Sequence, residues 1–337
     1  MTYKYNLIIS IVNYNGGEYI SQCLDLLLKA CSKSPKKILI VCIDNNSFDS
    51  SKEIINKYSD IEKLYLHQNI GFASAHNQIF RNYDAEYFLL LNPDTLLEDE
   101  YNLDKMLKYM DNHPEIAMAT CSILDENYRI IPSVAHQPTL INGCIEQFKF
   151  KPGFRYSRAT QIIARKLSKI FPIILNNYNP SYSNLKKPLN VKFIYGTYLL
   201  LRKSALDKIG YFDENFFLFW EEIDLCIRAR ELKFSIGFNP LTFIIHKYQK
   251  SQMSVPELSY YWRVASYFWI FKKYHPFKLV VWSIGTGLFQ FFLLIIKLVQ
   301  VKRIWLKIHF YLFQLSISFG KNYSMLMEKI KILYSDY

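Results

Sequence analysis

The chain has 337 residues, of which 50% are hydrophobic and 21% are charged, and this composition excludes an intrinsically disordered protein. Its 41 basic and 29 acidic residues give a net charge of +12, which suits a nucleic acid, an anionic membrane surface or an anionic small substrate. The basic residues accompany no nucleic-acid-binding motif, so we expect no nucleic-acid partner. The six cysteines show no paired spacing and fall mostly in apolar segments, which predicts reduced core residues without zinc or disulfides.

The N-terminal part alternates apolar runs with amphipathic segments. Strands are predicted at Leu7 to Val12, Lys37 to Ile43, Leu64 to His67 and Tyr87 to Leu91, with helices at about 18–32, 49–58 and 72–81. This alternation indicates a parallel α/β sheet. Ligands of such sheets bind beyond the carboxyl ends of the strands, so the polar residues there, Asn13, Asp44, Asn69 and Asp94, predict a nucleotide pocket. The first apolar run is too short for a signal peptide, so we expect the catalytic part to face the cytoplasm.

The middle of the chain is less regular. A helix at 101–112 and a strand at 116–121 close the first half, and residues 125–190 predict a variable loop or subdomain around a basic amphipathic piece at 162–174. The regular pattern then returns, with strands predicted at 191–194, 198–201, 235–238 and 242–247 and a helix at 204–209.

The stretch 216–228 places three acidic side chains directly behind an aromatic run, in the first turn of a helix that we expect to begin near Trp220. The helix dipole favours such acids, and Asp224 with Arg228 forms an i,i+4 pair, so ordinary helix chemistry explains at least one of them. The adjacent Glu221 and Glu222 would repel each other and lose water beside aromatic rings. Both effects raise a carboxyl pKa towards the range useful for a general base.

The last eighty or so residues mix basic side chains with long apolar runs, which indicates an anionic membrane surface. Leu279 to Ile296 contains no charged residue and is just long enough to cross a bilayer, whereas Ile308 to Phe319 is too short. Basic residues on both sides give no orientation. We expect a helical hairpin embedded in or lying on the inner leaflet; a single span and a buried soluble helix pair are the alternatives.

Five motifs occur in a characteristic order: SIVNYNG at 10–16, IDNNSFDSS at 43–51, NIGFASAHN at 69–77, LNPD at 91–94 and the long segment 195–228. Together, over about Leu7 to Ser251, they resemble the inverting, GT-A-type family 2 glycosyltransferases, in the branch that holds many bacterial rhamnosyltransferases. The resemblance implies an α/β fold of the GT-A type, a Rossmann-like nucleotide-diphospho-sugar transferase fold, followed by a C-terminal helical membrane-associated segment. It divides the chain into a nucleotide-sugar-binding half at 1–124, an acceptor-binding and catalytic half at 125–250 and the tail at 251–337.

The resemblance also implies the donor site. Asn13, Tyr14 and Asp44 would line the base, with Asp44 accepting a hydrogen bond from a pyrimidine N–H, although the turn around Asp44 would also serve to initiate a helix. The remaining predicted donor contacts are Asn69, Gly71, Phe72, Asn77, Asn92 and Asp94. Asp94 stands in the family's acidic metal motif, and His246 resembles a histidine that some relatives place on the metal. A carboxylate, an imidazole and diphosphate oxygens suit Mn²⁺, with Mg²⁺ possible.

By the same resemblance, Glu222 is the general base that removes a proton from the acceptor hydroxyl, with Glu221 as a rival that more plausibly positions the acceptor. Gly196, Trp220 and Asp224 complete the acceptor side. The expected reaction is an inverting transfer from a UDP- or dTDP-linked sugar to a glycan or lipid-linked acceptor, at the cytoplasmic face of the membrane, in surface polysaccharide synthesis. A nucleotidyltransferase would need a Gly-rich phosphate loop with a basic residue, which NYNGGEY lacks. The remaining alternative, a catalytically degenerate membrane scaffold, would be favoured if Asp94, Glu222 and His246 did not converge.

Overall fold

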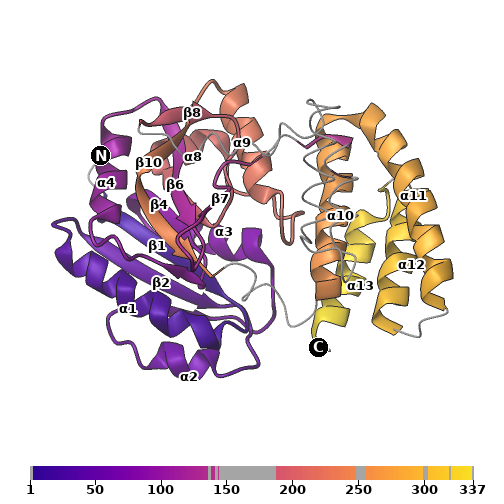
Figure 1. The fold of residues 1–337 in the computed structure, drawn as a ribbon, viewed down its shortest axis with the longest axis horizontal. Coiled ribbons are helices and arrows are strands. Elements are labelled where there is room, and N and C mark those ends of the chain that lie inside the picture. Colours follow the sequence, from indigo (N-terminus) through magenta and orange to yellow (C-terminus); the bar gives the residue numbers. More distant parts are fainter. Residues whose placement is uncertain are drawn as a thin grey trace. The chain divides into compact units, whose positions relative to one another are not determined.

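The computed structural model describes residues 3–135, 138–140, 143, 187–247, 256–298, 303–318 and 320–335. These residues form two compact units (Figure 1). The first unit contains the described residues up to 135, 187–214 and 221–247, and the second contains 138–140, 143, 215–220 and those from 256 onwards. The basic piece predicted at 162–174, most of the variable region and Ser251 lie outside the described residues.

The first unit is built on a parallel sheet, as predicted for the N-terminal part. Strands β1 (Tyr5–Asn13), β2 (Ile38–Asp44), β3 (Glu62–Tyr65) and β4 (Ala85–Leu91) pair in the order β3-β2-β1-β4. The crossovers contain helices α1 (Gly17–Lys33), α2 (Ser51–Asn56) and α3 (Phe72–Asn82). The centres of β1, β2 and β4 consist of Ile, Val and Leu that are buried on both faces, as parallel strands covered by helices require.

The second half of this unit makes the sheet a mixed one. After α4 (Asn102–Asp111) and β6 (Ile116–Leu124), strand β9 (Tyr198–Arg202) inserts between β4 and β6 and runs antiparallel to both. An antiparallel neighbour needs no βαβ crossover connection. Helix α8 (Lys203–Ile209), helix α9 (Glu221–Glu231) and β10 (Ser235–His246) follow. The last strand combines the two segments predicted at 235–238 and 242–247, with a register shift between Asn239 and Phe243.

Three short strands complete the sheet at its margin. β5 (Thr95–Leu96) and β8 (Leu189–Val191) pair antiparallel with β10, and β7 (Ile130–Ile131) pairs antiparallel with β6. Because β4 and β6 both run antiparallel to β9, and β10 runs parallel to β6, β10 has the direction of β1, β2 and β4. The carboxyl ends of β1, β2, β4 and β10 therefore lie at one edge of the sheet.

Four of the five described cysteines of this unit are core residues, as predicted, and Cys31 is partly buried. Cys23, Cys42, Cys121 and Cys226 are fully buried, and the described cysteines form no disulfide. Burial raises the pKa of the Cys23, Cys121 and Cys226 thiols to about 12, so these side chains are protonated and unreactive.

The second unit is helical and has an aromatic core. Its described helices include α10 (Pro256–Tyr274), α11 (Pro276–Leu298), α12 (Arg303–Ile317) and α13 (Tyr323–Ser335). Helix α11 contains the first apolar run predicted as a helix, and α12 contains most of the second. Trp282 of α11 lies against Tyr267 and Phe271 of α10, with ring centroids 5.0 and 5.7 Å apart. Among the helices of the described residues, none has the length and apolar composition needed to cross a membrane.

Candidate active site

The carboxyl edge of the sheet brings together the two residues predicted as metal ligands. His246 at the end of β10 places Nε2 3.1 Å from Asp94 Oδ1, and both side chains are buried. The short strand β5 makes this possible, because its Thr95 pairs with His246 while the Lys247 N–H donates to the Asp94 carbonyl oxygen at 2.9 Å. No cluster of three or more His, Cys, Asp or Glu side chains able to hold a metal occurs in the described part of the chain. The metal role of this pair stays a prediction.

Asn92 ties the LNPD loop to the neighbouring strand. Its backbone N–H donates to the Thr197 carbonyl oxygen at 3.2 Å, and its own carbonyl oxygen accepts from the Thr95 hydroxyl at 2.6 Å. Gly196 precedes Thr197, and a Cβ added at Gly196 would lie 3.6 Å from the Phe72 ring and 3.9 Å from Glu222 Cβ. Gly196, predicted on the acceptor side, therefore lies between the predicted donor residue Phe72 and the predicted base Glu222. The next residue, Thr197, makes the contact with LNPD.

The predicted nucleobase contact, Asp44, organises a turn at the end of β2. The Ser47 N–H donates to Asp44 Oδ2 at 3.0 Å, and the Asn13 side-chain amide donates to Oδ1 at 3.4 Å. The role as a turn former is thus confirmed. An ionised carboxylate has about four acceptor positions, so these bonds are compatible with a further donor from a pyrimidine. The nucleobase role of Asp44 and Asn13 stays a prediction.

Asn45 is a functional candidate that the sequence reasoning did not single out. Its side-chain amide donates to Asn69 Oδ1 at 2.9 Å, and its oxygen accepts from the Ile70 N–H at 2.9 Å. The Asn69 side chain in turn accepts from the Gly71 N–H at 2.9 Å, and Gly71 has φ 84°, a conformation that suits glycine. Tyr14 lies beside this clamp and bonds with Asn69, while burial raises the pKa of its hydroxyl. The side-chain amides thus hold the predicted donor segment in place.

Glu221 and Glu222 begin α9, as predicted, and both are buried. Burial raises the pKa of the Glu221 carboxyl well above its ordinary value, and the neighbouring charge of Glu222 raises it further. Within the described residues, Glu221 Oε2 has no hydrogen-bond partner. The Glu221 carboxyl therefore ionises reluctantly, and a perturbed carboxyl pKa of this kind is common at acid–base sites.

The two aromatic residues before these acids adopt a left-handed backbone. Phe219 has φ 68° and Trp220 has φ 75°, a region that costs an L-residue roughly 1–2 kcal/mol. Contacts within the helical unit offset this strain: the Arg263 guanidinium lies 4.0 Å from the Phe219 ring centroid, and the Trp220 and Tyr267 rings are 4.4 Å apart. Both rings are thus held by partners in the helical unit. The predicted acceptor contact of Trp220 stays a prediction.

Asn77 and Asp224 make bonds within the protein. The Asn77 amide donates to the Phe212 carbonyl oxygen at 2.9 Å and to Glu214 Oε1 at 2.8 Å, and accepts from the Phe212 N–H at 3.0 Å. The Asp224 carboxylate accepts from Arg228 Nε at 2.9 Å, which confirms the predicted i,i+4 pair. Both side chains hold the segment that leads to the acids, and their proposed ligand contacts stay predictions.

Arg228 joins α9 to the turn that follows α8. Besides Asp224, its guanidinium donates to the carbonyl oxygens of Ile209 at 2.7 Å, Gly210 at 3.0 Å and Tyr211 at 2.7 Å. We expect Arg228→Met to lower the free energy of unfolding by about 3–5 kcal/mol, because the buried Asp224 loses its cation. Urea unfolding measures this, with the exposed Lys233→Met as the control. A loss no larger than that of the control would contradict the role.

Glu221 should also give stability a measurable pH dependence. Its pKa in the folded protein is raised above the ordinary value of 4.5, so the folded state keeps a proton that the unfolded chain releases. This contribution is fully present below pH 4.5 and is lost as the pH rises through the raised pKa. We expect Glu221→Gln to flatten this decline and to stabilise the protein at pH 8 by on the order of 1–3 kcal/mol. Thermal unfolding between pH 5 and 8 tests this; an unchanged slope would contradict it.

His76 is a second residue that the sequence reasoning passed over. Its Nδ1 lies 2.7 Å from the Ser10 hydroxyl, and its ring meets that of Phe72 edge-on at 4.3 Å. Burial lowers the pKa of His76 to about 3, so the imidazole is neutral. The imidazole packs against the Phe72 ring. Its position inside the motif 69–77 is the feature of the sequence that could have identified it.

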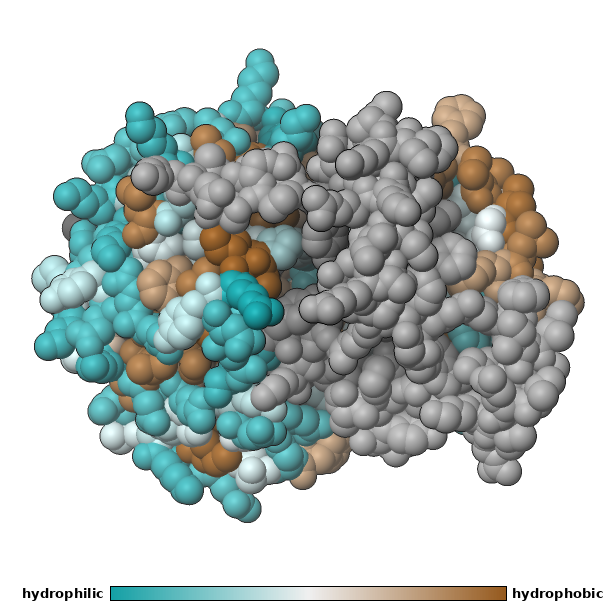
Figure 2. All heavy atoms as spheres, in the orientation of Figure 1, coloured by the Kyte–Doolittle hydropathy of each residue, from teal (hydrophilic) through white to brown (hydrophobic). Residues whose placement is uncertain are grey.

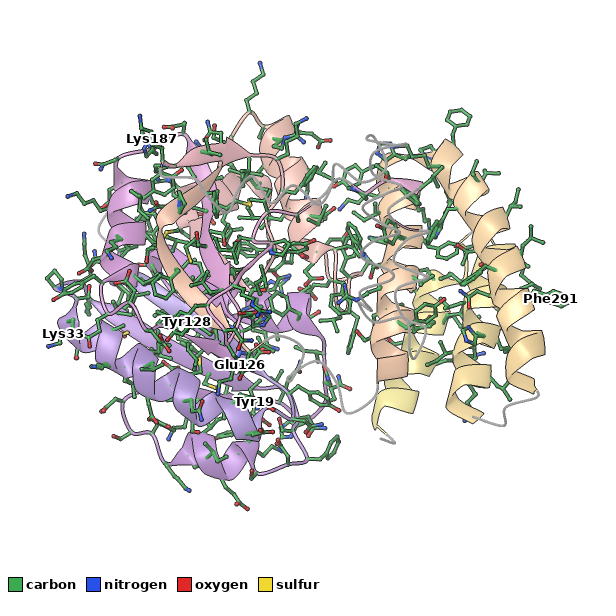
Figure 3. The ribbon with its side chains drawn as sticks, viewed as in Figure 1. Tyr19, Lys33, Glu126, Tyr128, Lys187 and Phe291 are labelled. Carbon is green, nitrogen blue, oxygen red and sulfur yellow. The ribbon has the colours of Figure 1, made fainter. Side chains whose placement is uncertain are left out.

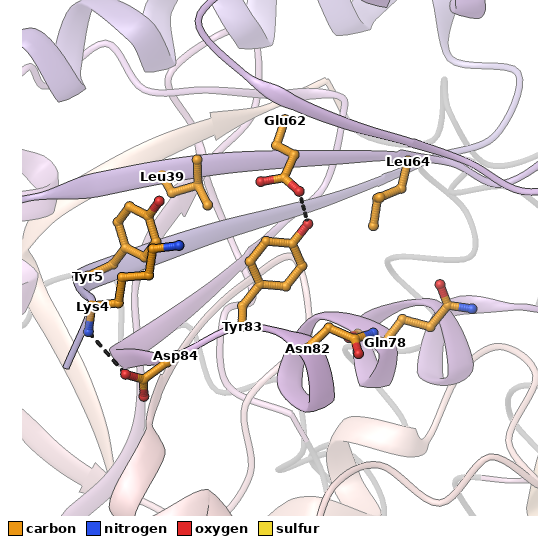
Figure 4. Close-up of a pocket in the computed structure, with 9 residues that line it drawn as sticks. All are labelled: Lys4, Tyr5, Leu39, Glu62, Leu64, Gln78, Asn82, Tyr83 and Asp84. Carbon is orange, nitrogen blue, oxygen red and sulfur yellow. Dashed lines mark hydrogen bonds between the residues drawn. The ribbon is translucent and has the colours of Figure 1, made fainter.

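A hollow of about 500 Å³ lies elsewhere on this unit (Figure 4). Its walls include Tyr5 at the start of β1, Tyr83 and Asp84 before β4, and Glu62 at the start of β3. These are the amino ends of the strands, opposite the edge that carries Asp94 and His246. Ligands of such sheets bind at the carboxyl ends, so this hollow is not the donor site.

The family profile for glycosyl transferase family 2 matches residues 8–210. The chain is 21% identical over 266 residues to rhamnosyltransferase WbbL of Escherichia coli K12, covering 77% of this chain and 90% of that protein. It is 23% identical over 247 residues to the N-acetylglucosaminyl-diphospho-decaprenol L-rhamnosyltransferase of Mycobacterium tuberculosis, covering 70% of this chain and 74% of that protein.

Solved structures show the same fold. The mannosyltransferase PcManGT of Pyrobaculum calidifontis, in complex with GDP-Man and Mn²⁺, matches with a TM-score of 0.51 and 12% identity, over 81% of this chain and 65% of that one. GalNAc-T7 with UDP, GalNAc and Mn²⁺ also gives 0.51, at 13% identity, over 78% and 48% of the two chains. This chain thus spans less than two thirds of either solved structure, and the likeness shows an α/β fold of the GT-A type with a mixed sheet. By its profile, its fold and its relatives, the chain belongs to glycosyl transferase family 2 and is rhamnosyltransferase-like.

Proposed function

We propose that the protein is an inverting glycosyltransferase that moves a sugar from a nucleotide-diphosphate donor to a hydroxyl of a glycan acceptor. The carrying observation is a short chain of contacts at the carboxyl edge of the sheet. LNPD, whose Asp94 meets His246, is bonded through Asn92 to Thr197, and the adjacent Gly196 lies against Glu222. The segment Gly196–Thr197 thus lies between the LNPD loop, suited to a diphosphate, and Glu222, suited to proton abstraction. This arrangement argues against the alternative of a degenerate scaffold.

The side chains support an inverting displacement. Glu222 would accept the proton of the acceptor hydroxyl as its oxygen attacks the anomeric carbon, on the side opposite the leaving diphosphate. Glu221, with its raised pKa, would position the acceptor as a hydrogen-bond donor or acceptor. The Asp94 carboxylate and the His246 imidazole are donor types that fit a divalent cation, Mn²⁺ or Mg²⁺. Such an ion, when bound, supplies positive charge that stabilises the departing nucleoside diphosphate.

The donor is proposed to be a UDP- or dTDP-linked sugar. Asp44 offers a buried carboxylate beside Asn13, which matches the N–H of a pyrimidine base. We expect Asp44→Asn to lower kcat/KM for the donor by roughly tenfold, the value of one well-made hydrogen bond, mostly through KM. Steady-state kinetics with UDP- and dTDP-sugars measure the change. The exposed Asp60→Asn is the matched control, and urea unfolding separates a local loss of binding from a disturbed turn.

The acceptor is proposed to be lipid-linked and the protein to work at the cytoplasmic face of the cell membrane, in surface polysaccharide synthesis. One relative bears a name that specifies a diphospho-decaprenol acceptor. The positive net charge of +12 suits an anionic leaflet.

The test is release of nucleoside diphosphate from a panel of donors, with and without Mn²⁺, for the wild type and Glu222→Gln. The proposal expects release from one donor that depends on metal and on Glu222. Donor binding without release, under every acceptor and metal condition, would favour the scaffold. Release that persists unchanged in Glu222→Gln but stops in Glu221→Gln would reverse the assignment of the base.

A further inference from the structure

Helix α11 buries an unusual number of polar side chains. Its described buried face carries Ser283, Thr286 and Gln290, each at most 2% exposed, beside Trp282 and Gly287. Its exposed face is apolar, and we call it the outer face of α11: Phe277, Val280, Val281, Ile284, Leu288 and Phe291. A surface helix in water typically has polar residues on its exposed face.

One of these buried polar residues, Gln290, joins three helices. The Gln290 amide donates to the Tyr260 hydroxyl of α10 at 2.7 Å, and its oxygen lies 2.6 Å from His309 Nδ1 of α12. A Cβ added at Gly287 would lie 3.3 Å from Ser316 Cβ, so small residues let α11 and α12 approach closely. Hydrogen bonds between helices and small residues at their contacts are the devices by which helices associate in an apolar solvent.

The outer face of α11 is also continuous. Its residues recur every three or four positions, so they form one stripe roughly 20 Å long, at 1.5 Å per residue. Phe277 is 90% exposed and Leu288 69% exposed. Figure 2 shows the hydrophobic colour along the edge that α11 occupies in Figure 1, and Figure 3 shows Phe291 pointing away from the helices. A contiguous exposed apolar patch of several hundred Å² typically marks an interaction surface.

The charge around this face selects the partner. From Leu258 to Met327 the sequence contains no Asp or Glu, whereas its basic residues are Arg263, Lys272, Lys273, Lys278, Lys297, Lys302, Arg303, Lys307 and Lys321. Lys272 and Lys273 are exposed at the end of α10, directly before α11. A second copy of this chain would present the same positive charge and be repelled. An anionic lipid surface satisfies both the basic residues and the apolar stripe.

We propose that the outer face of α11 is a membrane-docking surface, which enters the acyl region of an anionic bilayer while the neighbouring lysines contact the headgroups. This inference rests on the membrane location proposed above, but it does not depend on the transfer reaction. The stripe supplies the hydrophobic contribution and the lysines supply an attraction that salt screens.

The experiment is cosedimentation of the full chain with phosphatidylcholine vesicles, with and without phosphatidylglycerol. We expect wild type to bind the anionic vesicles, and the double variant Ile284→Glu/Leu288→Glu to bind at least about tenfold more weakly. Both residues are exposed, so the fold should tolerate the change, which circular dichroism checks. The matched control is Leu241→Glu, a leucine 59% exposed on the first unit, which should bind like wild type. Lys272→Gln/Lys273→Gln should weaken binding to anionic vesicles alone.

Two results would overturn the proposal. The stripe variant could sediment with vesicles as wild type does, or light scattering could show that wild type is a lipid-free dimer that the stripe substitutions convert to monomer, which would assign the face to a second copy. Release of nucleoside diphosphate in detergent, measured on the same variants, reports the transferase proposal separately, and stripe variants should retain it.

Discussion

Glu222→Gln is expected to lower kcat for sugar transfer by about 10²–10⁴-fold, the range for removal of a general base. The amide keeps the shape of the side chain beside Gly196 but cannot accept the proton of the acceptor hydroxyl. Donor affinity should change by no more than about twofold, since the loss falls on the transition state rather than on binding. Single-turnover kinetics and a separate titration with nucleoside diphosphate measure the two quantities.

Glu221→Gln is the matched control, since it makes the same chemical change one residue earlier on the same helix. The charge on Glu222 raises the pKa of Glu221, so Glu221 keeps its proton over the pH range in which Glu222 ionises. Glu221→Gln replaces one neutral side chain by another there, so it should leave the acidic limb of the kcat/KM profile in place and retain activity. If Glu221→Gln loses the larger share of kcat, Glu221 is the base and Glu222 its neighbour.

Much of the first unit follows from periodicity. The strands that become β1, β2 and β4 are unbroken apolar runs that end in polar residues, so both their existence and their shared edge could be predicted. His246 could be placed near Asp94 through the order of motifs. The antiparallel direction of β9 could not be predicted. A short apolar strand carries no sign of its direction, and the sequence pattern before it is irregular.

The parts of the site that escaped prediction depend on contacts between distant residues. The Asn45 clamp joins residues 24–26 positions apart, and the Arg228 contacts reach back 17–19 positions. Likewise, the left-handed backbone of Phe219 and Trp220 contradicts local preference and exists because rings of the helical unit hold it. The membrane prediction rested on hydropathy alone, which cannot show which face of α11 is buried. That face carries Ser283, Thr286 and Gln290 beside Trp282.

The second large effect is expected at the Asp94–His246 pair. His246 Nε2 and Asp94 Oδ1 lie 3.1 Å apart at the edge of the sheet. His246→Ala removes the imidazole, and Asp94→Asn removes the carboxylate charge. If the pair holds a divalent ion, each change should lower kcat/KM by about 10²–10³-fold, as removal of one group that stabilises developing charge does. Calorimetric titration of Mn²⁺ in the presence of nucleoside diphosphate should show metal binding weakened in both variants.

The control must separate loss of the ion from loss of structure. The control is His113→Ala. His113 is exposed and pairs with Glu115 at the surface, so the variant protein should bind Mn²⁺ like wild type. Asp94, just before β5, and His246, at the end of β10, are both buried, and their direct hydrogen bond alone would give each substitution a cost of about 1–3 kcal/mol in stability. A purely structural pair would therefore show lowered thermal stability and unchanged Mn²⁺ affinity. That combination would remove the metal from the proposed reaction and leave the general base as its sole assigned chemistry.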